Sequence, residues 1–176
     1  IVDDKEGVVI EIGTRVTTLR TFDNALIAIP NAILANQGVK NWSKRNLGRR
    51  IKMNLAIKYG SSSQDIKNAI NEIRAMLNMH EGIATQDTMY QYSAKESAKL
   101  VSQEDALGIK KTLLVYLDEF ADSSMNILVY CFTKSTDWQE WLETKEEVMH
   151  RIMEIFEKNN IEFAFPSLSL YQEENK

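Results

Sequence analysis

The hydrophobic pattern of this 176-residue chain changes once, near residue 53, and that change restricts the fold more than any other feature. Residues 1–52 contain short runs in which apolar and polar residues alternate, separated by turn signals such as Asp23-Asn24. Five short strands in about this length are typical of a small β-barrel. After residue 53, strands alternate with helix-length patterns. The sequence therefore predicts two domains of different architecture, 1–52 and 53–171, followed by a tail at 172–176.

The segment TLRTFDNALIAIPNAIL, residues 18–34, predicts a polar strand, a turn and a second, mostly apolar strand. Pro30 has no N–H to donate to a neighbouring strand, so it should end the second strand. Asn31 is a suitable cap for one helical turn, and VKNWS at 39–43 is predicted to form a fourth strand. An apolar strand in a domain this small needs a partner surface, which a second subunit can supply.

The second domain is predicted to follow the order β-α-β-β-α-β, which is that of a ferredoxin-like unit. Its first helix follows Ser61–Ser63 and has an apolar face made by Ile66, Ala69, Ile70, Ile73 and Leu77. Two strands are predicted at 111–120 and 124–132, and a short last strand at 161–165. The second helix is predicted over 137–159, with apolar positions at Trp138, Leu142, Met149, Ile152 and Phe156.

Residues 84–110 are an insertion in this plan. The run SAKESAKLVSQEDALG predicts an additional helix, with Ser93 and Glu96 as a capping box and Gly108 as its stop. The overall fold class is therefore α+β: a small five-stranded β-barrel, then a ferredoxin-like βαββαβ domain with an inserted helix.

The composition argues against catalysis, cofactors and metals. The single cysteine, Cys131, lies in an apolar run, so we expect a buried thiol and no internal disulfide. With only His80 and His150 beside it, we expect no Cys/His zinc site. Neighbouring acidic residues such as Asp118-Glu119 do not face each other, and no glycine-rich phosphate loop occurs. We therefore predict that the chain is not an enzyme and binds no cofactor or metal.

The charge is acidic overall, but one stretch is basic. Lysine and arginine number 21 against 25 acidic residues, a net charge of −4, so no global field attracts nucleic acid. Residues 40–52 nevertheless gather six basic side chains around Trp42. Such a stretch can bind single-stranded RNA, or it can be a solvated strand whose charges prevent edge aggregation.

The chain starts at Ile1, directly in a strand-like pattern and without the charged and apolar regions of a signal peptide. We expect a fragment whose natural start lies upstream. No apolar run approaches the ~18–20 residues that a membrane helix needs.

The first 50 residues carry an ordered set of motifs. They are Gly7, Val9 and Ile12, then T-x-L-R-T-x-D-N over Thr17–Asn24, I-P-N over Ile29–Asn31, N-x-S-K over Asn41–Lys44, and Arg49-Arg50. This pattern resembles the β-domain of the small-conductance mechanosensitive channel (MscS-like) family, and NNIEFAFPSLSLY resembles that family's closing strand. The chain departs from the family pattern at Ala25, Ala32, Asn160 and Ala164. The resemblance marks these residues as family-motif and assembly candidates: Arg20, Thr21, Asp23, Asn24, Pro30, Asn31, Asn41, Ser43, Arg49 and Arg50.

The resemblance implies an Sm-like β-domain and an α/β domain that together form the cytoplasmic vestibule of a tension-gated ion channel. Such a channel releases ions and small osmolytes on hypo-osmotic shock. The family implies a homo-oligomer, usually a heptamer, and upstream helices in the bacterial inner membrane, with this fragment on the cytoplasmic side. We expect no nucleic-acid partner. Arg20 and Asp23 are candidates for polar pairing in the ring.

Two other readings remain open at this point. A small barrel followed by a ferredoxin-like unit also resembles a soluble RNA-binding protein with Sm-like and RNA-recognition modules. A regulatory domain that binds a small molecule is the third possibility, because fold does not fix function.

Overall fold

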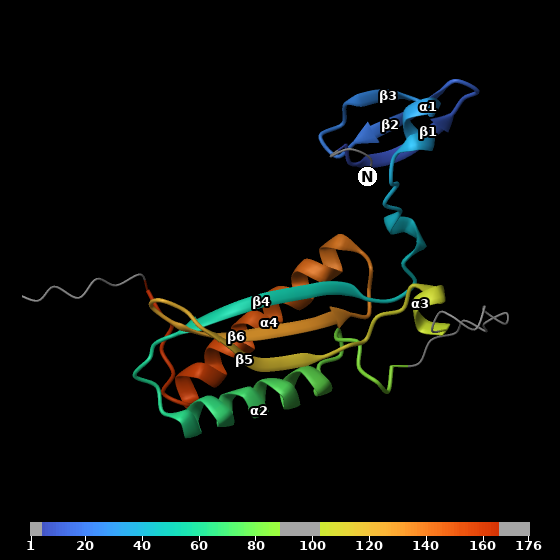
Figure 1. Cartoon of the computed structure of the whole chain (residues 1–176). Helices are drawn as coiled ribbons and strands as arrows, with labels where there is room; N and C mark the ends of the chain where they lie inside the picture. Colours follow the sequence, from blue (N-terminus) through green and yellow to red (C-terminus); the bar gives the residue numbers. More distant parts are fainter. Residues whose placement is uncertain (1–4, 89–102, 166–176) are drawn as a thin grey trace, which may run out of the picture. The chain divides into compact units, whose positions relative to one another are not determined.

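The computed structural model describes residues 5–88 and 103–165 (Figure 1). The chain divides into two compact units, Ile1–Lys44 and Arg45–Lys176. The boundary expected between residues 52 and 53 falls inside strand β4 (Arg49–Ile57). All of β4 pairs with strand β6 (Met125–Thr133), so its first residues belong to the second unit.

The first unit contains an antiparallel sheet in the order β1-β2-β3, formed by Gly7–Ile12, Val16–Thr21 and Leu26–Pro30. Helix α1 (Asn31–Asn36) follows directly. Leu19 and Ile29 are buried, whereas many apolar side chains of the unit are exposed, among them Val8, Val9, Ile10, Ile12, Val16 and Leu26. The sheet therefore presents a large apolar surface.

Three predictions for this unit are wrong. Residues 39–43 do not form a fourth strand; Trp42–Lys44 form the short 3₁₀ helix η1 instead. The segment offers only Val39 and Trp42 as apolar side chains, and both are exposed, so no core contact holds it extended. The described part of the unit consequently has three strands and not the predicted five-stranded barrel. Asn31 does not cap α1 either, because Pro30 takes the cap position.

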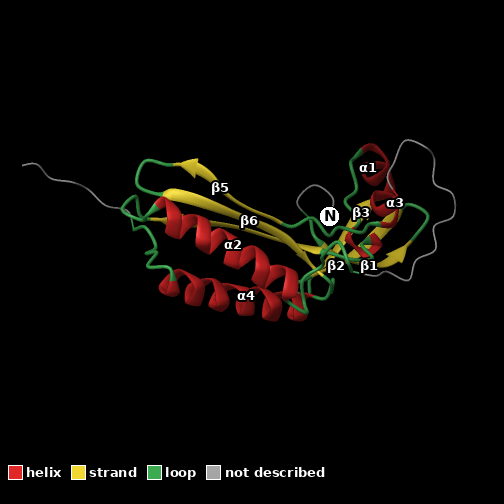
Figure 2. Cartoon of the chain, turned by 90° about the horizontal axis from the view of Figure 1, so that it is seen from below, coloured by secondary structure: helices red, strands yellow, loops and turns green. Residues whose placement is uncertain are grey.

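The second unit is a two-layer α+β structure. Its antiparallel sheet has the order β4-β6-β5, with β5 spanning Leu114–Phe120. Helices α2 (Ser63–Met79) and α4 (Trp138–Lys158) lie on the same side of this sheet (Figure 2). The predicted last strand is reduced to one bridge, Ile57 to Phe163, among the described residues. The α+β class is confirmed.

Local sequence explains where both long helices begin. The Ser62 hydroxyl accepts a hydrogen bond from the Gln64 N–H, and the Asp137 carboxylate accepts from Gln139 and Glu140. All five predicted apolar positions of α2 are buried in the core. On α4, Ile152 and Phe156 are buried as predicted.

The other three apolar positions named for this helix are exposed. Trp138 stands in the first turn, and Leu142 and Met149 lie on the sector of the helix next to the buried stripe. Val148, which was not singled out, lies in the core with Ile152 and Phe156. The spacing of Val148, Ile152 and Phe156 sets which side of the helix meets the sheet.

The insertion is partly described. Ser93, Glu96 and the rest of residues 89–102 lie outside the described residues, as do 166–176. Helix α3 (Gln103–Leu107) ends at Gly108, which has a left-handed φ of 67°, so the predicted stop is confirmed.

The residues after α3 pair with the entry to β4. Leu47 bridges Ile109, the Lys110 N–H donates to the Leu47 carbonyl, and the Asn46 side chain donates to Leu107. We call this pairing of residues 46–48 with 107–110 the clasp. It ties the insertion to the start of the second unit.

Candidate functional site

Four of the candidate residues surround the turn between β2 and β3. The Arg20 guanidinium donates to the Asn24 side-chain oxygen at 2.9 Å. The Thr21 hydroxyl bonds Asp23 and also accepts from the Ala25 N–H at 3.0 Å. Asn24 has a left-handed φ of 71°, a conformation that asparagine tolerates. Within the chain, Arg20 therefore contacts Asn24, while Asp23 is held by Thr21. That hydroxyl, with a backbone hydrogen bond, lowers the pKa of Asp23.

Asn31 connects the other end of the sheet. Its amide donates to the Gly13 carbonyl at 2.9 Å, and its side-chain oxygen accepts from the buried Thr17 hydroxyl at 2.8 Å. Its backbone N–H donates to Arg15. Asn31 thus fixes the β1–β2 turn against the start of α1. Pro30 pairs with Val16 at the end of β3.

The remaining candidates lie away from that turn. Asn41 precedes η1 and Ser43 lies within it. Arg49 and Arg50 belong to the second unit, where the Arg49 guanidinium lies 4.9 Å from the Trp141 ring centre and 5.8 Å from that of Trp138.

Trp138 and Trp141, in the first turn of α4, therefore pack against the start of β4. The Trp141 indole N–H donates to the Arg50 carbonyl at 3.2 Å. The basic stretch is consequently divided between the two units, and Arg49, one of its members, already stacks on aromatic rings of its own chain.

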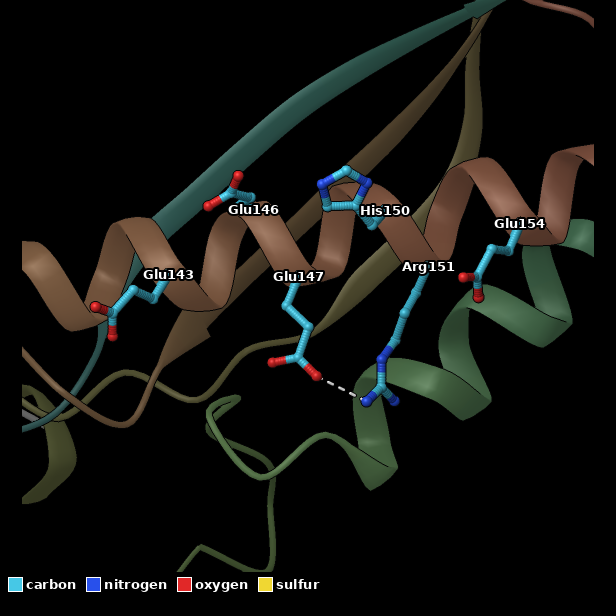
Figure 3. Close-up of a pocket in the computed structure, with 6 residues that line it drawn as sticks. All are labelled: Glu143, Glu146, Glu147, His150, Arg151 and Glu154. Carbon is cyan, nitrogen blue, oxygen red and sulfur yellow. Dashed lines mark hydrogen bonds and ion pairs between the residues drawn. The ribbon is translucent and has the colours of Figure 1, made fainter.

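A third group of polar residues lines the outer face of α4 (Figure 3): Glu143, Glu146, Glu147, His150, Arg151 and Glu154. Figure 3 shows the carboxylate of Glu147 turned toward Arg151, and the two form an ion pair at 2.7 Å. Each member lies three or four residues from at least one other, so they share one side of the helix. The surface is acidic, since four carboxylates face one arginine and one histidine.

His80 lies beneath this surface, and its burial was not predicted from the sequence. His80 is the C-cap residue of α2, and its backbone N–H donates to the Leu77 carbonyl. The ring itself is buried, with its Nε2 atom 3.4 Å from the Glu147 carboxylate. Sequence alone contains no signal for this contact, since Glu147 lies on a different helix.

A hydrogen bond to one ring nitrogen identifies the tautomer of the neutral His80 imidazole. Nδ1 accepts from the Gly82 N–H at 3.1 Å, so the ring hydrogen belongs on Nε2. Nε2 has no hydrogen-bond partner among the described residues. Burial lowers the pKa of His80; Arg151 and Lys134 act in the same direction, and Glu147 and Glu81 oppose them.

We expect stability to fall as His80 is forced to take up a proton. A folded-state pKa below the unfolded value means that the unfolded chain binds more protons, so stability rises with pH in that interval. The contribution of neutral, buried His80 to the free energy of unfolding is complete above about pH 6.5. It is lost as the pH falls from there toward the lowered pKa of His80. Urea unfolding at steps between pH 7.5 and 5 measures this decline.

Two variants isolate the contribution of His80. His80→Gln should flatten the decline below pH 6.5 relative to the parent chain. His150→Gln, which replaces the exposed histidine on α4, should leave it in place. Equal slopes in the His80→Gln variant and the parent would contradict the assignment.

Three further predictions concern the environment of the single cysteine, a metal site and a membrane-spanning helix. Cys131 is buried as expected, and burial raises the pKa of its thiol to about 12. Within residues 5–88 and 103–165, no group of three or more histidine, cysteine or acidic side chains is arranged to hold a metal ion. In the same residues, no helix combines the length and apolarity required to cross a bilayer.

Comparison with known proteins identifies both units. Residues 1–44 match the model of the mechanosensitive ion channel β-domain, and residues 51–163 match the model of the C-terminal part of the mechanosensitive ion channel MscS. An uncharacterized MscS family protein of Helicobacter pylori J99 is 49% identical over 175 residues, which cover 96% of this chain and 28% of that protein. The low conductance mechanosensitive channel YnaI of Escherichia coli is 35% identical over 168 residues, covering 96% of this chain and 41% of YnaI.

Solved structures show the same fold. The closed-state crystal structure of Helicobacter pylori MscS aligns with a TM-score of 0.68 at 20% identity, covering 98% of this chain and 56% of that one. Arabidopsis thaliana MSL1 aligns with a TM-score of 0.69 at 20% identity, covering 93% and 50%. None of these matches favours the RNA-binding alternative.

The chain is a two-unit α+β protein. In its described part, hydrogen-bonded turns order the first unit and charged side chains cover α4 of the second. The chain belongs to the MscS family of mechanosensitive ion channels. It spans 28% of the length of the Helicobacter pylori relatives and about two fifths of YnaI.

Proposed function

We propose that this chain forms the vestibule portion of a tension-gated channel that releases ions and small osmolytes on hypo-osmotic shock. The observation that supports this most strongly is the order of the two family matches. The β-domain model and the C-terminal model follow one another along the chain and together account for nearly all of it up to residue 163.

The surface of the first unit is consistent with assembly. Its sheet exposes Val8, Ile10, Ile12 and other apolar side chains, which association with further copies would cover. We propose a homo-oligomer, a heptamer as is usual in the family. The membrane-spanning part lies outside this chain, in the bacterial inner membrane, with this portion on the cytoplasmic side.

The motif residues are proposed to shape the surfaces that meet in the ring. Arg20, Thr21, Asp23 and Asn24 hold the β2–β3 turn, and Asn31 holds the opposite turn. These contacts orient the strands; none of them involves a catalytic arrangement. Arg49 and Arg50 are proposed to act through their packing on α4.

Recording from the complete protein tests the proposal. The full reading frame should encode apolar runs of ~20 residues ahead of Ile1. Patches from bacteria that lack their own mechanosensitive channels, and express this protein, should show stepwise conductance as suction increases. Patches from the same strain carrying an empty vector are the control. A reading frame without such apolar runs, or patches that stay silent until they rupture, would refute the proposal.

A further inference from the structure

A small pocket of about 240 Å³ lies at the open edge of the second unit's sheet, apart from the surfaces described above. Strand β5 is the outer strand of the order β4-β6-β5, and helix α2 packs beside it (Figure 1). The pocket is lined by two cationic side chains, Arg74 and Lys111, and by uncharged ones. No aspartate or glutamate is among the lining residues.

The Arg74 guanidinium is held firmly at this edge. Its Nε and Nη2 atoms donate to the Val115 carbonyl at 3.1 and 2.5 Å, and Nη1 donates to the Asn71 side-chain oxygen at 3.2 Å. The guanidinium also lies 4.7 Å from the centre of the Tyr116 ring. These contacts fix the plane of the fork, so an incoming anion would meet an already ordered donor.

The positive charge of Arg74 is not balanced by the part of the chain that the structure describes. No described carboxylate lies within ion-pair distance of it, although the side chain is partly buried. Lys111 adds a second positive charge; Glu104 neutralises much of it at 3.0 Å, and the Gln86 carbonyl accepts from the same ammonium at 3.1 Å. Arg74 is therefore the cation that a ligand would engage directly.

The rest of the lining indicates what kind of anion fits. Leu113 and the Tyr116 ring form an apolar wall, while Asn78 and Thr85 supply amide and hydroxyl groups. An inorganic anion has no apolar part, so it would leave the apolar surface of Leu113 and Tyr116 exposed to water. We propose that this pocket binds a small organic carboxylate, with its carboxylate on Arg74 and its apolar chain against Leu113 and Tyr116. This inference does not depend on the proposed channel function.

Titration of the ¹⁵N-labelled 176-residue chain with butanoate, at constant ionic strength in chloride, tests the proposal. We expect saturable shifts at the Arg74 Nε–H and at the amides of Thr85 and Tyr116. Affinity should rise from acetate to butanoate by about two- to fourfold per methylene group. Inorganic phosphate is the third probe and should bind more weakly than butanoate.

Two matched variants separate binding from general charge effects. Asn78→Asp places a carboxylate in the pocket and should weaken butanoate at least fivefold. Asn68→Asp makes the same change on an exposed part of the same helix and should leave the affinity within twofold. Lys111→Gln should also weaken binding, which keeps the test valid if Asn78→Asp does not fold.

Three results would overturn the proposal. The first is a set of shifts that grow linearly without saturation, and the second is equal affinity in the Asn78→Asp and Asn68→Asp variants. The third is tighter binding of phosphate than of butanoate, which would rule out the organic carboxylate as the ligand class.

Discussion

Replacing Phe156 with alanine should lower the free energy of unfolding of the second unit by about 3–5 kcal/mol. The side chain is only 1% exposed, lies in the core cluster and contacts Phe163 with ring centres 5.0 Å apart. Truncation removes both the buried ring and its contact with Phe163, which bridges Ile57 of β4. Urea denaturation followed by tryptophan fluorescence measures the loss.

The control for this substitution lies one turn earlier on the same helix. Met153 is 48% exposed, so Met153→Ala removes a flexible apolar side chain without opening a cavity. We expect a change within about 1 kcal/mol. Similar losses in both variants would mean that α4 is oriented differently from the structure described here.

Replacing Gly48 with alanine should cost roughly 2–4 kcal/mol. Gly48 has a φ of 95°, and a Cβ placed on it would lie 2.4 Å from the Lys110 carbonyl oxygen. That oxygen is backbone and belongs to the clasp, so it cannot move aside without breaking the pairing of 46–48 with 107–110. Thermal and urea unfolding should both report the loss.

Gly60 provides the matched comparison. A Cβ there would meet nothing within 4 Å, and its φ is not in the left-handed region. Gly60→Ala should therefore leave stability unchanged or raise it by less than about 1 kcal/mol. If the two glycine variants unfold alike, the clasp does not contribute to stability.

The elements that sequence predicted well are those whose determinants lie close together in the chain. Helix α2 has its cap, its apolar face and its end within one short window, so periodicity was sufficient. Helix α4 was placed correctly along the chain. Its buried side was only partly predicted, because the sheet decides which sector of an amphipathic helix is covered.

The features that were predicted wrongly or missed have a different cause: their structure depends on residues far away in the sequence. Residues 39–43 have strand-forming residues but no strand to pair with inside the unit, and they form η1 instead. The burial of His80 depends on α4, and the pocket around Arg74 depends on an edge strand far along the chain. The ordered family motifs predicted membership in the MscS family correctly, although the geometry around each motif residue required the structure.

The pairing of β4 with β6 has a consequence for synthesis on the ribosome. Arg49 and its partner Thr133 are 84 positions apart, whereas β5 and β6 are joined by a tight turn closed by the Ala121 N–H and the Ser124 carbonyl. At typical elongation rates of ~5–20 residues per second, β4 waits roughly 4–17 seconds for its partner to emerge. During that interval Ile51 and Ile57 lack the part of their core cluster that β6 supplies, such as Ile127 and Val129. The charges of Arg49, Arg50, Lys52 and Lys58 then act as gatekeepers that discourage aggregation of the nascent strand.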